Sequence, residues 1–383
     1  MSALTQHRPG PRPTLPLSPQ DYYGMLRTER FRWWKGLLGI VLFLVGFFLL
    51  SALFGTAGII VDLVRGDVTP EQFSADQIAE GVLPMGPGLF IGNNLALAGL
   101  IPLSVLVNRL VFGQRGGWLS SVSGRFRWRW LAWCLLAIGL PWLVAMLVEL
   151  FVAGGVGATV VLSTPVLVLL VLMLVTTPLQ AAGEEWGFRG FIPRCIAAMV
   201  PNAKVGLAVA AVLSSALFMV SHLAQDPWLN VFYFFLALVF MALTWRTGGL
   251  EAAVVLHAVN NVVALTPVIL TDQLGGAMDR SAGVGNWTTL LPIVLGIALV
   301  FVAGQLARRR GIARVSAPGL AELQAPRVDG AAAPGSVCAT DPEADTSSGT
   351  TAPHTDSDQS ARRVTLDVYE HRDDPQHGAD DRP

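Results

Sequence analysis

The sequence is poor in charged residues and in cysteine. Asp, Glu, Lys and Arg make up 14% of its 383 residues, whereas soluble globular proteins contain about 25%. With 52% hydrophobic residues and a mean hydropathy of +0.54, the chain has too few polar side chains to cover the surface of a soluble fold. Its three cysteines, Cys134, Cys195 and Cys338, form no CxxC pair. This spacing excludes a disulfide framework and a thiolate zinc site.

The chain also lacks an excess of charge of either sign. Its formal net charge is -1 and its isoelectric point is near 6.6. A nucleic-acid-binding protein needs a basic surface, and a disordered acidic chain needs a large negative charge. Both classes are excluded, and an integral membrane protein remains.

Long apolar stretches are what the sequence does contain. A helix needs roughly 20 apolar residues to cross the hydrocarbon core, and about eight stretches meet this length. The sequence therefore predicts an all-α polytopic membrane protein of about eight transmembrane helices. We expect these helices near 36–60, 86–111, 129–152, 160–182, 204–223, 228–245, 250–270 and 287–306.

The two ends of the chain have a different composition. Residues 1–34 begin with a Pro-rich segment that has no apolar signal sequence, and they end in an aromatic and basic stretch typical of a membrane interface. Residues 308–383 are basic at first and then rich in small and polar residues. We expect 1–34 to be a flexible tail with an interfacial lead-in, 35–307 to be the transmembrane domain, and 308–383 to be disordered.

Basic residues fall on alternate loops. Both flanks of the transmembrane domain and the loop between the second and third helices are rich in Arg, whereas the first loop is acidic. Because loops rich in Lys and Arg stay in the cytoplasm, we expect a multi-pass protein of the cell membrane with both termini cytoplasmic. An even number of helices agrees with this orientation.

Ionisable residues within apolar helices are rare, and each is a functional hypothesis because burying a charge in hydrocarbon is costly. They fall into three segments of this chain. These are AAGEEWGFRGF with Glu184, Glu185 and Arg189, SSALFMVSHL with Phe218 and His222, and VLHAVNNVV with His257, Asn260 and Asn261.

Helical spacing predicts how these side chains pair. Arg189 follows Glu185 by four residues, which allows an ion pair and leaves Glu184 free to act as a general base on water. His257 and Asn261 share a helix face in the same way. Three helices would then bring one carboxylate, two imidazoles and an amide to one cavity.

Such a set can support hydrolysis in two ways. Glu184, His222 and His257 could hold a divalent metal, with zinc as the first choice, and a water at its open position. Without a metal, Glu184 would activate water, and histidine and asparagine would donate hydrogen bonds to the oxyanion. Simpler interpretations are an interfacial acidic patch at Glu184, a loop residue at His222, and a helix–helix hydrogen bond at His257.

The three motifs in this order resemble the CPBP family of intramembrane proteases, which comprises CAAX prenyl proteases and bacteriocin-processing or Abi proteins. The resemblance covers about 160–270 and is carried by EEWGFR from Glu184, FMVSH to His222 and HAVNN from His257. It implies an intramembrane metalloendopeptidase of the type II CAAX prenyl endopeptidase kind. The substrate would be a membrane-associated protein or peptide, with no nucleic acid involved.

The resemblance also implies roles for single residues. Glu184 matches the glutamate that activates water, and His222 matches a second catalytic or metal-binding group. His257 and Asn261 match the last motif, which holds metal or the oxyanion, while Glu185 and Arg189 support the site. Two other functions stay open, a proton-coupled transporter and a non-catalytic scaffold or immunity protein. The sequence does not name a substrate or an oligomeric state.

The expected boundaries conflict with this site. Glu184 falls near the cytoplasmic end of the fourth predicted helix and His222 near the far end of the fifth, up to about 25 Å apart at about 1.5 Å per residue. The motif order therefore predicts one of two corrections. Either residues 184–200 form a helix that returns into the membrane with a bend at Pro193, or the fifth helix has other boundaries.

Overall fold

The structure is a computed structural model that describes residues 13–73, 84–152, 159–276 and 280–320. These residues belong to one compact unit that extends to Arg327. A second unit, Val328–Pro383, lies outside the described residues. Within the described ranges the regular structure is helical, and strand-like pairing is limited to two isolated bridges, Asp21 with Val315 and Ser121 with Gly249.

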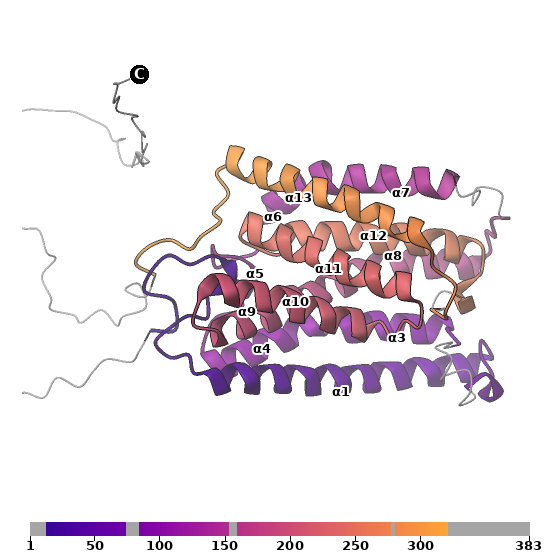
Figure 1. Ribbon diagram of the computed structural model, residues 1–383. Coiled ribbons are helices and arrows are strands. Elements are labelled where there is room, and N and C mark those ends of the chain that lie inside the picture. The colour runs from indigo at the N-terminus through magenta and orange to yellow at the C-terminus, as the bar shows by residue number, and fades with distance from the viewer. Residues whose placement is uncertain (1–12, 74–83, 153–158, 277–279, 321–383) are drawn as a thin grey trace, which may run out of the picture. The chain divides into compact units, whose positions relative to one another are not determined.

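Eight helical segments are long and apolar enough to cross a membrane, which confirms the predicted all-α polytopic fold for the described part of the chain. Several are built from consecutive helices, visible in Figure 1. The segments are α1 (Trp33–Arg65), α3 with α4 (Pro87–Ala98 and Leu100–Phe112), α6 with η3 and α7 (Trp128–Cys134, Leu135–Gly139 and Leu140–Val152), α8 with η5 and α9 (Thr164–Glu184, Glu185–Phe191 and Ile192–Met199), α10 (Ala203–Ser221), α11 (Pro227–Thr247), α12 (Glu251–Leu270), and η7 with α13 (Trp287–Leu290 and Leu291–Arg309).

Local sequence determines where these helices begin and end. Ser163, Asn202 and Asp226 each accept a hydrogen bond from a backbone N–H of the first turn, at the starts of α8, α10 and α11. α4 and α11 end at Gly113 and Gly248, whose positive φ angles of 72° and 68° suit glycine.

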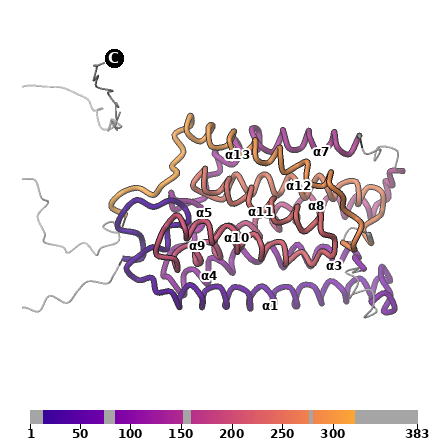
Figure 2. Tube along the Cα trace, in the orientation of Figure 1, coloured from indigo at the N-terminus to yellow at the C-terminus, as the bar shows by residue number. Residues whose placement is uncertain are grey.

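The two ends of the bundle differ in which connections they carry. The terminal end is formed by the segments 13–32, 113–127, 200–202, 247–250 and 310–320. The opposite end is formed by 66–73, 84–86, 159–163, 222–226, 271–276 and 280–286. The helices run back and forth between them, as the trace in Figure 2 shows. In this arrangement α8 packs against both α3 and α12, and α10 packs against α9 and α11.

The fourth transmembrane segment is longer than the sequence predicts. Helical structure continues without a break from Thr164 to Met199, through one stretch of π-helix at Glu185–Phe191. The predicted end at residue 182 and the predicted return helix over 184–200 are therefore wrong. Apolar composition alone places the end of a span at its first charged residues, but these charges are paired inside the protein.

The terminal end is packed with segments that the sequence assigns to flexible or disordered tails. Leu15, Tyr22 and Tyr23 are buried ahead of α1. After α13, Ser316 is buried, and its backbone N–H donates to Gln20 O at 2.8 Å. Residues 13–20, expected to be flexible, and residues 308–320, expected to be disordered, are instead packed, because apolar side chains such as Leu15 and Leu320 join the core. The rest of the predicted tails, 1–12 and 321–383, lies outside the described residues.

Candidate active site

Glu184 lies in the interior of the fourth segment, at the last residue of α8. It is buried, and its Oε1 accepts a hydrogen bond from Gln180 Nε2 at 2.9 Å, one turn earlier. Gly183 precedes it at the contact between α8 and α3, where an added Cβ would collide with the carbonyl oxygen of Leu97. Glycine at this position thus allows the close approach of α3 and α8 beside the carboxylate.

Glu185 is fully buried and contacts the side chains of Arg189 and His257. Its Oε1 lies 3.4 Å from a guanidinium nitrogen of Arg189, as the four-residue spacing predicted. The same oxygen lies 2.7 Å from His257 Nδ1. The prediction of the pair is confirmed, but the histidine contact is an addition, and it connects the first motif to α12.

His257 joins the two acidic residues. Its Nε2 lies 3.4 Å from Glu184 Oε2, while its Nδ1 is held by Glu185. Among the described residues Arg189 pairs with Glu185 and not with Glu184, as predicted, but Glu184 has two other contacts. Gln180 and His257 hold one oxygen each, although Glu184 Oε2 has no hydrogen bond of normal length among the described residues.

Aromatic rings enclose these charges. The Arg189 guanidinium lies 3.8 Å from the ring centroid of Phe218 and 4.7 Å from that of Phe240. The His257 ring stacks on Phe240 at a centroid separation of 4.9 Å. Since these rings exclude water and attract the cation, they fix Arg189 and His257 around the acidic pair.

His222 is the first residue after α10, where it caps the helix end. Its Nδ1 lies 2.8 Å from the carbonyl oxygen of Phe218, and its ring stacks on Tyr233 at 3.9 Å. Because a carbonyl oxygen only accepts, Nδ1 carries the proton and Nε2 keeps its lone pair. Burial, with a smaller contribution from Arg280, lowers the pKa of His222 to about 3, so the ring is neutral at physiological pH.

The extended fourth segment removes the conflict in depth between Glu184 and His222. The chain rises 15 residues from Glu184 to Met199 and returns 19 residues from Ala203 to His222. At about 1.5 Å per residue these paths are about 22 Å and about 28 Å long, so the two residues differ by only about 6 Å along the helices. The 25 Å separation expected from the sequence came from the misplaced end of the fourth helix.

One cavity of about 510 Å³ contains both residues. Its polar lining includes Glu184, His222, Asn260 and Asn261, and α1, α3, α7 and α11 contribute further wall residues. His257 is not among the residues that line this cavity, and its Nε2 contacts Glu184 from behind. The structure thus brings Glu184, His222 and Asn261 to one cavity, as predicted, and places His257 beneath it.

The two asparagines form a chain of amides along one wall. Asn260 Nδ2 donates to Asn261 Oδ1 at 3.1 Å, and Asn261 Nδ2 donates to Gln180 Oε1 at 3.1 Å. Through Gln180 this chain reaches Glu184. Amide donors therefore lie on the same wall as the carboxylate.

The predicted metal ligands do not form a metal site in this geometry. Across the described ranges, no three His, Cys, Asp or Glu side chains lie close enough together to bind one ion. Of the three predicted ligands, His257 is engaged at both nitrogens by carboxylates, and it lies outside the cavity that His222 lines.

Sequence reasoning missed three residues of the site. Gln180 lies one turn before Glu184 in an otherwise apolar helix, and that spacing was a readable signal. Tyr233 and Phe240 come from α11, whose interior has no Asp, Glu, Lys, Arg or His before Arg246 in the last turn. Their contributions depend on how α11 packs against α10 and α12, which no local pattern encodes.

Comparisons with known proteins agree with the motifs. Residues 162–263, roughly a quarter of the chain, match the family model described as type II CAAX prenyl endopeptidase Rce1-like. Searches of curated proteins and of solved structures found no match. The matched segment contains Glu184, His222, His257 and Asn261, and it confirms the resemblance to the CAAX protease family. From residue 162 to residue 263 the chain is therefore similar to the Rce1-like family of type II CAAX prenyl endopeptidases.

Proposed function

We propose that this protein is an intramembrane endopeptidase that cleaves peptide bonds of membrane-associated proteins or peptides. The observation that carries the proposal is the shared cavity of Glu184 and His222, with His257 3.4 Å behind the carboxylate. Membership of the matched segment in a protease family supports a hydrolase. The reaction below uses only side chains of this chain.

Glu184 and His222 activate the water in the proposed reaction. Water donates one hydrogen bond to Glu184 and the other to the lone pair of His222 Nε2, which is free because Nδ1 donates to Phe218. This pair of acceptors aims the oxygen lone pair at the peptide carbonyl carbon. Glu184 takes a proton as the new carbon–oxygen bond forms, which is general-base catalysis.

The side-chain amides of Asn260 and Asn261 stabilise the negative oxygen that forms in this step. Asn261 Nδ2, which donates to Gln180 in the resting structure, turns toward the carbonyl oxygen, with Asn260 beside it. Donors of this kind favour the transition state because the charge they meet develops during the reaction. Glu184 then returns its proton to the leaving amine nitrogen, and the peptide carbon–nitrogen bond breaks.

Glu185, Arg189 and His257 act as positioning residues. His257 links the two carboxylates at 3.4 Å and 2.7 Å, and Arg189 compensates the charge of Glu185 at 3.4 Å. With Glu185 neutralised, the charge of Glu184 is the one that faces the cavity. The predicted role of His257 as an oxyanion donor is thereby transferred to the asparagines.

A cleavage assay with the full chain tests the proposal. Purified protein in detergent is mixed with a library of fluorogenic peptides, each attached to one membrane-anchoring helix, and the wild type is compared with Glu184→Gln and His257→Ala. Glu71→Gln, an exposed acidic side chain at the opposite end, is the matched control. We expect cleavage by wild type and control, loss in Glu184→Gln and strong reduction in His257→Ala.

Equal cleavage by all four proteins would contradict the proposed site. No cleavage by any of them, with a cellular phenotype that survives Glu184→Gln, would favour a scaffold or immunity protein. The same assay with a chelator tests the metal requirement. A loss of activity that zinc restores would show that the reaction needs a metal, which Glu184, His222 and His257 would then have to hold.

A further inference from the structure

The side chains that line the catalytic cavity come from the bundle interior and from one end of it. Beyond Glu184 the wall continues to His222 at the end of α10, to Arg280 between α12 and α13, and to Thr288 in η7. Met85, ahead of α3, lies on the same side. No described residue of the terminal end lines the cavity. The hollow thus extends from the carboxylate toward the opposite end.

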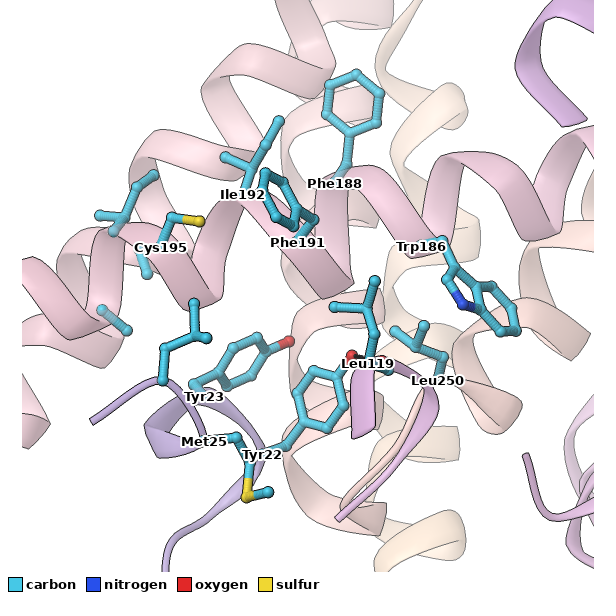
Figure 3. Close-up of a cluster of buried hydrophobic side chains, with 14 of the residues drawn as sticks. Tyr22, Tyr23, Met25, Leu119, Trp186, Phe188, Phe191, Ile192, Cys195 and Leu250 are labelled. Atoms are coloured by element: carbon cyan, nitrogen blue, oxygen red, sulfur yellow. Dashed lines mark hydrogen bonds between the residues drawn. The ribbon is translucent and has the colours of Figure 1, made fainter. Parts of the chain in front are cut away.

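The terminal end is filled by side chains. Figure 3 shows Tyr22 and Tyr23, from the segment ahead of α1, packed with Phe191, Leu119 and Leu250 into one buried cluster. All five are 1% exposed or less.

Hydrogen bonds fix the segments of this cluster. Tyr22 donates to the carbonyl oxygen of Leu119, and Tyr23 contacts Met241 on α11. Gln114 donates to the carbonyl oxygens of Thr14 and Met25, at 2.8 Å each. A peptide that approached from the terminal end would have to displace this packed layer.

Charge fixes which side of the membrane each end faces. Among the described residues of the opposite end and its flanking helix turns (62–73, 84–86, 149–152, 159–163, 222–227, 271–276 and 280–290), the basic residues are Arg65 and Arg280, and six acidic residues accompany them. The terminal end and its flanking helix turns carry most of the other Lys and Arg residues that the structure describes, including Arg308 and Arg309 in the last turn of α13 and Arg310 directly after it. Because basic loops remain in the cytoplasm, the acidic end faces the other side.

We propose that substrates reach the catalytic cavity from the extracytoplasmic face of the membrane. The substrate class is therefore a membrane-anchored chain whose scissile segment lies on that face or in the adjoining half of the bilayer. This inference rests on the proposed function for the identity of the reaction. The route into the cavity is a separate property that can be measured without cleavage.

Single cysteines test the route directly. The full chain carries Cys338→Ser, since Cys134 and Cys195 are fully buried, and receives one new cysteine. Val284→Cys marks the opposite end, Thr288→Cys marks the cavity wall, and Glu29→Cys marks the exposed surface of the terminal end. Intact cells are treated with a membrane-impermeant maleimide before and after permeabilisation. We expect the first two to be labelled in intact cells and Glu29→Cys only after permeabilisation.

Two results would overturn the route. Labelling of Glu29→Cys alone in intact cells would reverse the orientation. Labelling of Val284→Cys without Thr288→Cys would show that the cavity is closed at the opposite end. Both results are independent of catalysis, so they are distinct from a failure of the proposed function.

The functional arm uses the anchored peptides that the purified enzyme cleaves. Modified Thr288→Cys protein should lose at least tenfold in cleavage rate, whereas the same reagent on Glu29→Cys should leave the rate unchanged. In cells, peptides with the scissile segment outside should be cleaved and those with it inside should not.

Discussion

Glu251 and Glu184, two of the buried acidic residues at α12, differ in how completely they are paired. Glu251, at the first residue of α12, accepts hydrogen bonds from Arg127 through the backbone N–H at 2.8 Å, Nε at 2.9 Å and a terminal guanidinium nitrogen at 2.6 Å. Glu184, which meets α12 at His257, has one hydrogen bond of normal length and a 3.4 Å contact. Both lie in the protein interior.

This difference in pairing distinguishes a carboxylate that only stabilises the fold from one that can take part in a reaction. A carboxylate whose oxygens are all paired holds two segments together, and it has no capacity left to accept a proton from water. A buried carboxylate with a poorly satisfied oxygen beside a cavity retains that capacity, although it costs stability. The predictions below test this contrast, in order of decreasing effect.

Glu184→Gln should abolish cleavage and leave the fold intact. The amide keeps the shape and one oxygen but cannot take a proton, so the rate should fall by about 10²- to 10⁴-fold, the usual contribution of a general base. The cleavage rate and the midpoint of thermal unfolding in detergent would be measured together. A large drop in unfolding temperature would mean that Glu184, like Glu251, mainly stabilises the fold.

Glu251→Gln should have the reverse profile. Removing this charge leaves Arg127 buried without its ion pair, and breaking such a buried pair costs about 3–5 kcal/mol. Thermal unfolding should show the loss, while the folded fraction should keep its cleavage rate. Asp67→Asn, which breaks the exposed pair with Arg65, is the control and should change little.

Asn261→Ala should reduce the maximal rate more than the affinity. Loss of one oxyanion donor lowers turnover by about 10²- to 10³-fold in other hydrolases, and Asn260 beside it should reduce the deficit here. The kcat and KM values of one cleaved peptide would be compared. A rise in KM with an unchanged kcat would assign Asn261 to substrate binding.

Gln180→Leu should lower the rate by about tenfold, because Glu184 Oε1 would lose its only side-chain hydrogen-bond donor among the described residues. Gln180→Glu places a second negative charge beside Glu184 and should shift the pH–rate profile, which Leu would not do. Identical profiles for the two variants would reduce Gln180 to a packing residue.

The smallest expected effect is on the stability of the fold at low pH, through Asp226. Asp226 caps α11, and hydrogen bonds from the backbone N–H groups of Leu229 and Gly283 hold its pKa below the usual value. A lowered pKa in the folded state adds stability above the unfolded pKa of about 3.9, and this stability is lost as pH falls below it. Unfolding midpoints of wild type and Asp226→Asn should therefore converge toward pH 3.

The sequence was sufficient for the parts of this protein that depend on composition and on spacing along one helix. Eight apolar stretches predicted the eight spans, and the four-residue spacing predicted the pairing of Glu185 with Arg189. The order of the motifs predicted that Glu184 and His222 line one cavity, even though the expected boundaries kept them apart.

The remainder depends on contacts between distant helices. No pattern within α12 indicates that His257 contacts both acidic residues of another helix, or that Phe240 of α11 stacks on its ring. The same holds for Leu15 and Tyr22, whose Pro-rich surroundings resemble a solvated tail. Their burial becomes visible only when the terminal end of the bundle is assembled.

The pairing of Asp21 with Val315, reinforced by Gln20 and Ser316, brings early and late parts of the chain side by side. The first and last described segments of the bundle therefore lie next to each other. A gene rearranged to join residue 320 to residue 13 through a short linker, with new ends cut between α12 and α13, should still insert and fold. Such a permuted protein would carry fusion partners on the acidic face, next to the cavity mouth.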